Sequence, residues 1–192
     1  MHDQLGKLLG SPARVKLLRL FLFNPGIVLT TKEIATRARV DISVARRELS
    51  IYKGIALIRE RKRTKEKSYV LNTSFTYLEA LQHLLLNLPT RGVDISKRLR
   101  GVGVIRLIVL CGIFIDDYQG RIDLFVVGDR INEVKLKTAI RTVESEIGKE
   151  LRYVFLKTDE FLYRLDIYDK LVRDVFDYPH TIPLDKLNIG LK

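Results

Sequence analysis

The side chains best suited to chemistry in the first third of the chain are guanidinium, ammonium and hydroxyl groups in two short segments. The members are Ser43, Arg46, Arg47 and Ser50 in the first segment, and Arg61, Lys62, Arg63, Lys65 and Lys67 in the second. An arginine can bind guanine through a forked pair of hydrogen bonds, and a serine can reach bases or phosphates. Lysine binds phosphate as a point charge. Both segments are therefore candidate contacts to a nucleic acid.

The first segment requires a helix that carries these polar groups on one side only. Ala45, Leu49 and Tyr52 fall at i, i+4 and i+7, so they share a face and pack inward if residues 42–53 are helical. The serines and arginines of the first segment then point outward. Asp41 can cap the start of this helix, and Gly54 is expected to end it as a left-handed cap.

Two further helices are predicted to precede this one. Ser11-Pro12 is typical of a helix start, and the apolar run that follows ends at residues 24–26, Asn-Pro-Gly. A short β-type run, residues 27–29, leads into a second helix over residues 32–39. Thr30 or Thr31 can cap that helix, and Glu33 makes a capping box plausible.

The second basic segment is predicted to form the tip of a β-hairpin. Residues 56–60 and 68–71 are β-type runs on either side of the polar stretch 61–67. A helix with apolar residues on more than one face is expected from residue 73 to about residue 87, as a connector and dimer contact. Residues 89–92 are the expected linker, followed by a short basic helix over residues 94–100.

The distribution of charge agrees with a polyanionic partner for the N-terminal half. The whole chain carries a net charge of +11, of which residues 1–90 supply +9 and residues 91–192 only +2. Concentrated positive charge attracts nucleic acid through counterion release. A basic surface that serves solubility alone is the alternative interpretation.

The order helix, helix, turn, helix and hairpin resembles the winged helix-turn-helix of small bacterial and archaeal regulators. The likeness rests on residues 29–35 (LTTKEIA), 41–49 (DISVARREL) and 54–58 (GIALI). It implies that residues 42–53 form the recognition helix and that the hairpin is a wing contacting phosphates. Two alternatives stay open: Arg46 and Arg47 lie on an ordinary solvated face, or the domain contacts protein rather than DNA.

The C-terminal half is predicted to hold buried strands at residues 105–110 and 122–127, a helix over 132–147 and a third strand at 151–156. Residues 158–171 and 171–175 are expected to be helical. Within this half, residues 108–113 (IVLCGI) and 120–129 (GRIDLFVVGD) resemble the minimal nucleotidyltransferase domain. That family uses a Gly-Ser pair for nucleotide phosphates, and Asp-x-Asp with a third carboxylate for Mg²⁺.

The residues depart from that family at the positions that carry its chemistry. Gly112 matches, but Ile113 replaces the serine; Asp123 matches, but Arg121 replaces the first aspartate. Arg152 falls near the expected third carboxylate. One carboxylate between two arginines repels Mg²⁺, because hard cations require clustered anionic oxygens. The resemblance therefore implies the fold without the activity, and no catalytic residue, metal or cofactor is predicted.

Several alternatives remain for this degenerate site. Asp116 and Asp117 can replace the lost carboxylates only if their loop folds back. Asp123 and Asp129 can be structural, with Arg121 and Arg152 paired to acidic neighbours such as Asp123 or Glu150. A sharper hypothesis is that the arginines bind a nucleotide or another anion as an effector. An active transferase of nucleotidyl groups and an antitoxin-like interaction module are the competing functions.

The sequence as a whole predicts an α+β protein of two domains. These are a winged helix-turn-helix over residues 1–72 and a nucleotidyltransferase-like mixed sheet with flanking helices over residues 96–192, joined by residues 73–95. The expected partners are double-stranded DNA and a second copy of the chain. The single cysteine, Cys111, and the absence of an apolar run long enough for a membrane span favour the cytoplasm.

Overall fold

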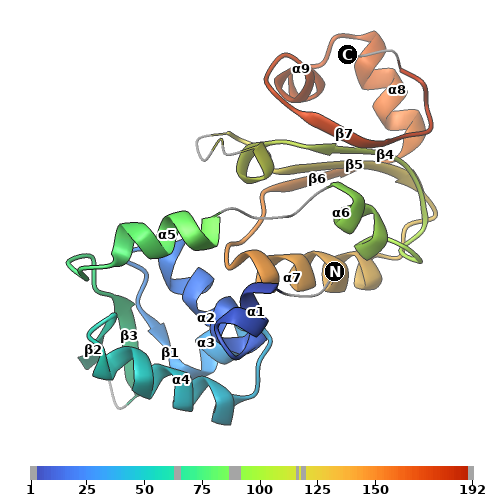
Figure 1. Ribbon diagram of the computed structural model, residues 1–192. Helices are drawn as coiled ribbons and strands as arrows, with labels where there is room; N and C mark the ends of the chain where they lie inside the picture. Colours follow the sequence, from blue (N-terminus) through green and yellow to red (C-terminus); the bar gives the residue numbers. More distant parts are fainter. Residues whose placement is uncertain (1–3, 63–65, 87–91, 116, 118–119, 190–192) are drawn as a thin grey trace. The chain divides into compact units, whose positions relative to one another are not determined.

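A computed structural model describes residues 4–62, 66–86, 92–115, 117 and 120–189. The fold is of the mixed α+β type, and the described residues form two β-sheets (Figure 1). The chain divides into two compact units, residues 1–88 with 141–150 and residues 89–140 with 151–192. Within the described residues no helix is long and apolar enough to cross a membrane.

The first unit combines helices with a small antiparallel sheet whose strand order is β1-β3-β2. Strand β3 pairs with β1 through Leu29 and Tyr69, and with β2 from Ile58 and Leu71 to Lys62 and Lys67. The elements are α1 (Gln4–Leu8), α2 (Pro12–Leu22), β1 (Leu29–Thr30), α3 (Thr31–Ala38), α4 (Ile42–Gly54), β2 (Ile58–Lys62), β3 (Lys67–Leu71) and α5 (Leu78–Leu86).

The helix starts follow the capping rules read from the sequence. Ser11 accepts a hydrogen bond from the Arg14 amide at 3.4 Å, and Pro12 occupies the first turn of α2. At the start of α3, Glu33 N–H donates to Thr30 Oγ1 at 3.3 Å, and Thr30 N–H donates to Glu33 Oε2 at 2.7 Å. The predicted capping box is thus confirmed. Asp41 precedes α4 as predicted but makes no side-chain capping bond.

One apolar core holds α2, α3 and α4 together. Phe21 and Tyr52 meet edge to face with their ring centroids 6.4 Å apart. Ala45, Leu49 and Tyr52, the predicted inner face of α4, are all buried. Because burying a large apolar side chain is worth about 1.5–3 kcal/mol, this face fixes the direction in which α4 turns its polar side.

An ion pair whose carboxylate end is buried also ties α4 to α2. Arg14 donates from Nε to Glu48 Oε2 at 2.8 Å and from Nη2 to Oε1 at 3.1 Å, and Glu48 is 4% exposed. The Tyr52 hydroxyl donates to the Arg14 carbonyl at 2.9 Å. The hydrogen bond to Glu48, opposed by burial, raises the pKa of Arg14 above its usual value. No local sequence pattern predicts this link, since it joins residues 34 positions apart.

Replacing Glu48 by glutamine is expected to lower the free energy of unfolding by about 1.5–3 kcal/mol, because a buried charge-assisted pair loses its charge on one side. Glu150→Gln is the matched control: Glu150 is largely exposed and pairs with Arg37 in the same unit, so its loss is expected to cost about 0–1 kcal/mol. Urea denaturation followed by circular dichroism measures both. Equal costs for the two variants would contradict the role assigned to Glu48.

Two predictions around α4 and α5 are wrong. Gly54 is the last residue of α4 rather than a left-handed cap, and Ala56 takes the left-handed conformation instead, with φ of 60°. The helix expected from residue 73 begins at Leu78. Before it, Asn72 donates to the Ala56 carbonyl at 2.8 Å and accepts from the Ser74 amide at 3.2 Å, which stabilises a turn instead of a helix.

The second unit is built on a four-stranded mixed sheet in the order β6-β5-β4-β7, in which β5 and β6 are parallel and the other pairs antiparallel. In Figure 1, α8 and α9 lie on one face of this sheet, and α6 and the first part of α7 on the other. The elements are α6 (Gly92–Arg98), β4 (Val104–Leu110), the 3-10 turn Gly112–Ile115, β5 (Leu124–Asp129), α7 (Glu133–Ile147), β6 (Tyr153–Leu156), α8 (Thr158–Asp166), α9 (Lys170–Phe176) and β7 (Thr181–Asp185).

The second unit differs from the prediction at several places. Strands β5 and β6 begin at Leu124 and Tyr153, each two residues later than predicted. The helix expected over residues 158–171 is interrupted, because Tyr168 is left-handed with φ of 54° and Asp169 caps α9 by accepting from the Leu171 amide at 3.0 Å. Strand β7 is not foreseen by the sequence analysis. The short basic helix begins at Gly92 and ends at Arg98, and the predicted linker residues 89–91 lie outside the described residues.

Residues 141–150 belong to the first unit, whereas the sequence analysis places them in the domain 96–192. In the first unit, Arg19 donates to the Glu146 carbonyl at 2.9 Å, and Asn24 donates to the Gly148 carbonyl at 2.7 Å. Gly148 has φ of 85°, and a Cβ there would lie 2.5 Å from the Arg19 backbone. Such side-chain-to-backbone bonds leave no local pattern by which the sequence could reveal them.

Candidate functional site

The outward side of α4 is a polar surface on a rigid helix. Ser43, Arg46, Arg47 and Ser50 are all exposed, as the sequence predicts. At about 100° per residue, Ser43, Arg47 and Ser50 lie within about 60° of one another around the helix axis. Arg46 lies at the edge of this group. Along the helix, Arg47 lies between the short side chains of Ser43 and Ser50, while the exposed Ile51 lies on its other flank.

The two arginines of α4 keep their hydrogen-bond donors available. No residue in the described part of the chain forms a salt bridge with Arg46 or Arg47. By contrast, Lys53 at the end of the same helix pairs with Glu60 of β2. Each free guanidinium offers five donors in a planar fork, a geometry that matches phosphate or the edge of guanine.

The hairpin β2–β3 adds exposed positive charge to the first unit. Arg61 and Lys67 are exposed, and neither forms a salt bridge within the described residues. The Ser68 hydroxyl donates to the Arg61 carbonyl at 2.7 Å and holds this end of the ladder. The Lys62 side chain and residues Arg63 and Lys65 lie outside the described residues.

Arg59 is a basic residue of the hairpin that the sequence analysis missed. It is exposed and lies two positions before Arg61 on β2, so both side chains point to the same face of the strand. The two-residue spacing of Arg59 and Arg61 is visible in the sequence and, on a strand, indicates that both side chains lie on one face. Arg59 therefore joins Arg61 as a candidate phosphate contact on this face, whereas Lys67, which pairs with Lys62, lies on the other face of the hairpin.

In the second unit, Asp123 is buried and fully engaged by hydrogen bonds. Arg152 donates from Nε to Oδ2 at 2.9 Å, from Nη2 to Oδ1 at 2.8 Å and from its backbone amide to Oδ2 at 2.9 Å. The Ile113 amide donates to Oδ1 at 3.1 Å. This bidentate pair confirms the interpretation that Arg152 is neutralised by Asp123.

The environment keeps the Asp123 carboxylate charged. Burial alone would raise its pKa, but the hydrogen bonds from Arg152 and Ile113 outweigh burial, and its pKa is lowered. The same contact raises the pKa of Arg152. Both oxygens of Asp123 are thus committed to donors, and neither is free to hold a metal ion.

Gly112 allows the Asp123 carboxylate to approach the backbone closely. Its φ of 51° is left-handed, and a Cβ at this position would lie 2.2 Å from Asp123 Oδ1. The next residue, Ile113, is buried and supplies no hydroxyl group. A glycine is needed here because the carboxylate approaches the backbone closely.

Arg121 does not join the cluster around Asp123. Its side chain is 76% exposed and forms a 3.4 Å ion pair with Asp174. Gly112, Ile113, Asp123 and Arg152 come together as the sequence predicts, and Arg121 lies apart. Asp117 accepts from the Gly120 amide at 3.1 Å within its own loop, and Asp116 lies outside the described residues. Among the described residues, no three His, Cys, Asp or Glu side chains are grouped to hold a metal.

No protein-family model matches the chain, and neither do any of the curated proteins or solved structures with which it was compared.

Proposed function

We propose that the chain is a DNA-binding transcriptional regulator in which α2–α4 and the hairpin β2–β3 act as a winged helix-turn-helix. The observation that carries the proposal is the polar side of α4, where two arginines have no ion-pair partner among the described residues and the opposite side of the helix is fixed in the core. A recognition helix needs this combination of an apolar back and a donor-rich front.

In this proposal, α4 and the hairpin have different tasks. Arg47 and Arg46 enter the major groove and read base edges, where a bidentate contact to guanine is worth about 1–3 kcal/mol of discrimination. Arg59, Arg61 and Lys67 contact phosphates and set the register without reading sequence. A homodimer would place two α4 helices about one turn of DNA apart on a palindromic site.

The second unit is proposed to be a nucleotidyltransferase-like domain without catalysis, serving regulation or assembly. The ion pair between Asp123 and Arg152 supports this part of the proposal, because the carboxylate that would bind Mg²⁺ already accepts four hydrogen bonds. In-line transfer of a nucleotidyl group requires unpaired carboxylates for its metal ions.

Replacing Arg61 and Lys67 by alanine is expected to weaken binding to every duplex alike, since phosphate contacts carry no sequence information. The slope of log affinity against log salt should fall by about 1 for each phosphate that the variant no longer neutralises. Fluorescence anisotropy with two duplexes of unrelated sequence, at several salt concentrations, measures both quantities.

The matched control is Arg100→Ala with Lys135→Ala, which removes the same charge from exposed positions of the second unit. Its salt slope should equal that of the parent. If the hairpin variant and this control lose affinity to the same extent, the hairpin makes no contact and net charge alone explains the binding.

A further inference from the structure

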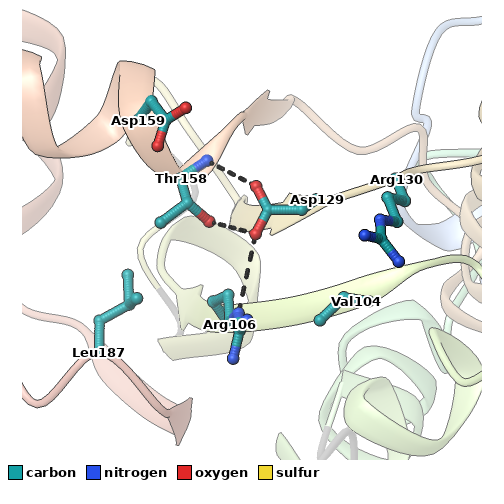
Figure 2. Close-up of a pocket in the computed structure, with 7 residues that line it drawn as sticks. All are labelled: Val104, Arg106, Asp129, Arg130, Thr158, Asp159 and Leu187. Atoms are coloured by element: carbon teal, nitrogen blue, oxygen red, sulfur yellow. Dashed lines mark hydrogen bonds and ion pairs between the residues drawn. The ribbon is translucent and has the colours of Figure 1, made fainter.

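The second unit contains a cavity of about 560 Å³ at one end of its sheet. Figure 2 shows the side chains around it, which come from β4, the end of β5, the start of α8 and the segment after β7. They are Val104, Arg106, Asp129, Arg130, Thr158, Asp159 and Leu187. Pockets that bind small molecules commonly measure about 300–1,000 Å³, so the volume suits a small organic ligand.

This cavity is separate from the Asp123 cluster. In the ladder between β4 and β5, Val104 pairs with Asp129 at one end and Leu110 pairs with Leu124 at the other. The cavity is at the Val104 end, whereas Asp123 directly precedes Leu124. The two sites therefore lie at opposite ends of the same pair of strands.

Asp129 lines the cavity and is held in place by hydrogen bonds and an ion pair. Its carboxylate accepts from Thr158 N–H at 3.2 Å and from the Thr158 hydroxyl at 2.8 Å, and it pairs with Arg106 at 3.7 Å (Figure 2). These donors, chiefly the Thr158 hydroxyl, lower the pKa of Asp129. The contacts attach the start of α8 to the end of β5, and they neutralise Asp129 within the wall of the cavity.

Two opposite charges of the wall have no ion-pair partner among the residues that the structure describes. Arg130 and Asp159 are exposed, and neither forms a salt bridge within the part of the chain that the structure describes. In Figure 2 they lie on opposite sides of the cavity, with Asp129 and Arg106 between them. Arg130 also has a left-handed backbone, with φ of 51°, which is uncommon for a residue other than glycine and occurs often at ligand sites.

The wall between the two charges is partly apolar. Val104 is 40% exposed although it begins a strand, and Leu187 lies on the opposite wall, after β7. A simple anion would be repelled by Asp159, and a simple cation would be repelled by Arg130. A ligand that satisfies the whole wall carries a positive group at one end, a negative group at the other and an apolar body.

We infer that this cavity binds a short zwitterionic peptide, with its terminal amine beside Asp159, its carboxylate beside Arg130 and its apolar side chains over Val104 and Leu187. A dipeptide with aliphatic side chains carries both terminal charges on one apolar body, as the charges and the apolar residues of the wall require. The inference goes beyond the proposed function and does not depend on DNA binding by the first unit.

The test uses the full chain and three forms of each probe. Leucyl-leucine, alanyl-leucine and valyl-valine are titrated as free dipeptides, as N-acetyl dipeptides and as dipeptide amides, by calorimetry and by ligand-observed NMR. At least one free dipeptide should bind, and its two capped forms should bind about tenfold or more weakly, since each lacks one charge-assisted hydrogen bond. No binding of any free dipeptide, or equal binding of a capped form, would overturn the inference.

Variants assign each end of the ligand to its residue. Asp159→Asn should weaken binding of the free dipeptide but not of the N-acetyl form, because the N-acetyl form lacks the charged amine that Asp159 would contact. Arg130→Gln should likewise weaken binding of the free dipeptide but not of the amide, which lacks the carboxylate that Arg130 would contact. Asp166→Asn and Arg100→Gln, exposed in the same unit, are the matched controls. Circular dichroism confirms that each variant folds. If Asp159→Asn and Arg130→Gln bind the free dipeptide as tightly as the controls do, the peptide does not bind in this cavity.

Discussion

Replacing Arg46 and Arg47 together by alanine is expected to remove the preference of the chain for its own DNA site. Each arginine that reads a guanine contributes about 1–3 kcal/mol of discrimination, so the ratio of specific to non-specific affinity should fall at least about 30-fold. The fold should be unaffected, because both side chains are exposed and make no salt bridge among the described residues. Substitutions at such positions usually change stability by no more than about 0.5 kcal/mol.

The measurement begins with selection of a preferred site from a pool of random duplexes. Anisotropy titrations then compare the selected duplex with a scrambled one for the parent, for Arg46→Ala with Arg47→Ala, and for the charge-matched control Arg100→Ala with Lys135→Ala. The control should keep the ratio of the parent and lose only a little overall affinity. An unchanged ratio in the Arg46 and Arg47 variant would show that α4 does not read bases.

The two arginines are also expected to differ from one another. Arg47 lies at the centre of the outward side of α4, whereas Arg46 lies at its edge. The single change Arg47→Ala should therefore cost more selectivity than Arg46→Ala, and Arg46→Ala should cost more non-specific affinity relative to its effect on selectivity. The reverse order would mean that α4 approaches DNA with a different side.

The second large effect is expected at Asp123. Its change to alanine should lower the free energy of unfolding by about 3–5 kcal/mol, because Arg152 loses a buried partner and two backbone amides lose their acceptor. The Arg152 side chain is 41% exposed, so water can hydrate its charge and the cost should lie toward the lower end. Thermal and urea denaturation of the full chain, followed by circular dichroism, measure the loss.

Asp174→Ala is the matched control for this prediction. Asp174 pairs with the exposed Arg121 at 3.4 Å in the same unit, and breaking this surface pair should cost about 0–1 kcal/mol. A similar small cost for Asp123→Ala would contradict the structural role of the ion pair. Transfer of labelled nucleotide by the parent with Mg²⁺ or Mn²⁺, lost in Asp123→Ala under conditions where circular dichroism shows that variant to be folded, would show instead that Asp123 is catalytic.

The same carboxylate predicts the direction of a pH effect. The pKa of Asp123 is lowered on folding, so its contribution to stability is fully present above the unfolded value of about 3.9 and is lost as the pH falls through the folded value. Asp123→Asn cannot titrate at this position. Its stability relative to the parent should therefore improve as the pH drops below about 4.

The parts of the fold that the sequence predicts well depend on short-range rules. The capping box at Thr30 and Glu33 and the inner face of α4 follow from spacings of three or four residues, and the structure confirms both. The errors at residues 54–56 and 73–77 arise where Asn72 bonds to the backbone of Ala56, sixteen positions away. Local patterns carry no information on such a contact.

The two units differ in how far the candidate site residues can be predicted. On α4 a single helical period separates buried from exposed side chains, so Ser43, Arg46, Arg47 and Ser50 are placed correctly. The pairing of Asp123 with Arg152 was one alternative among several, because only the sheet brings the start of β5 beside Arg152. Arg121 is two positions from Asp123, yet it pairs with Asp174, 53 positions away in the sequence.

The most direct test of the central claim, that α4 and the hairpin β2–β3 bind duplex DNA, is an NMR titration of the ¹⁵N-labelled full chain with the selected duplex. The largest amide shifts are expected at residues 43–50 and 59–61. Amides of the second unit, for example those of Asp123 and Arg152, should shift less, because no DNA contact is assigned to them. The account would be contradicted if the largest shifts lay in the second unit, or if residues 43–50 showed no shift once the protein is saturated with DNA.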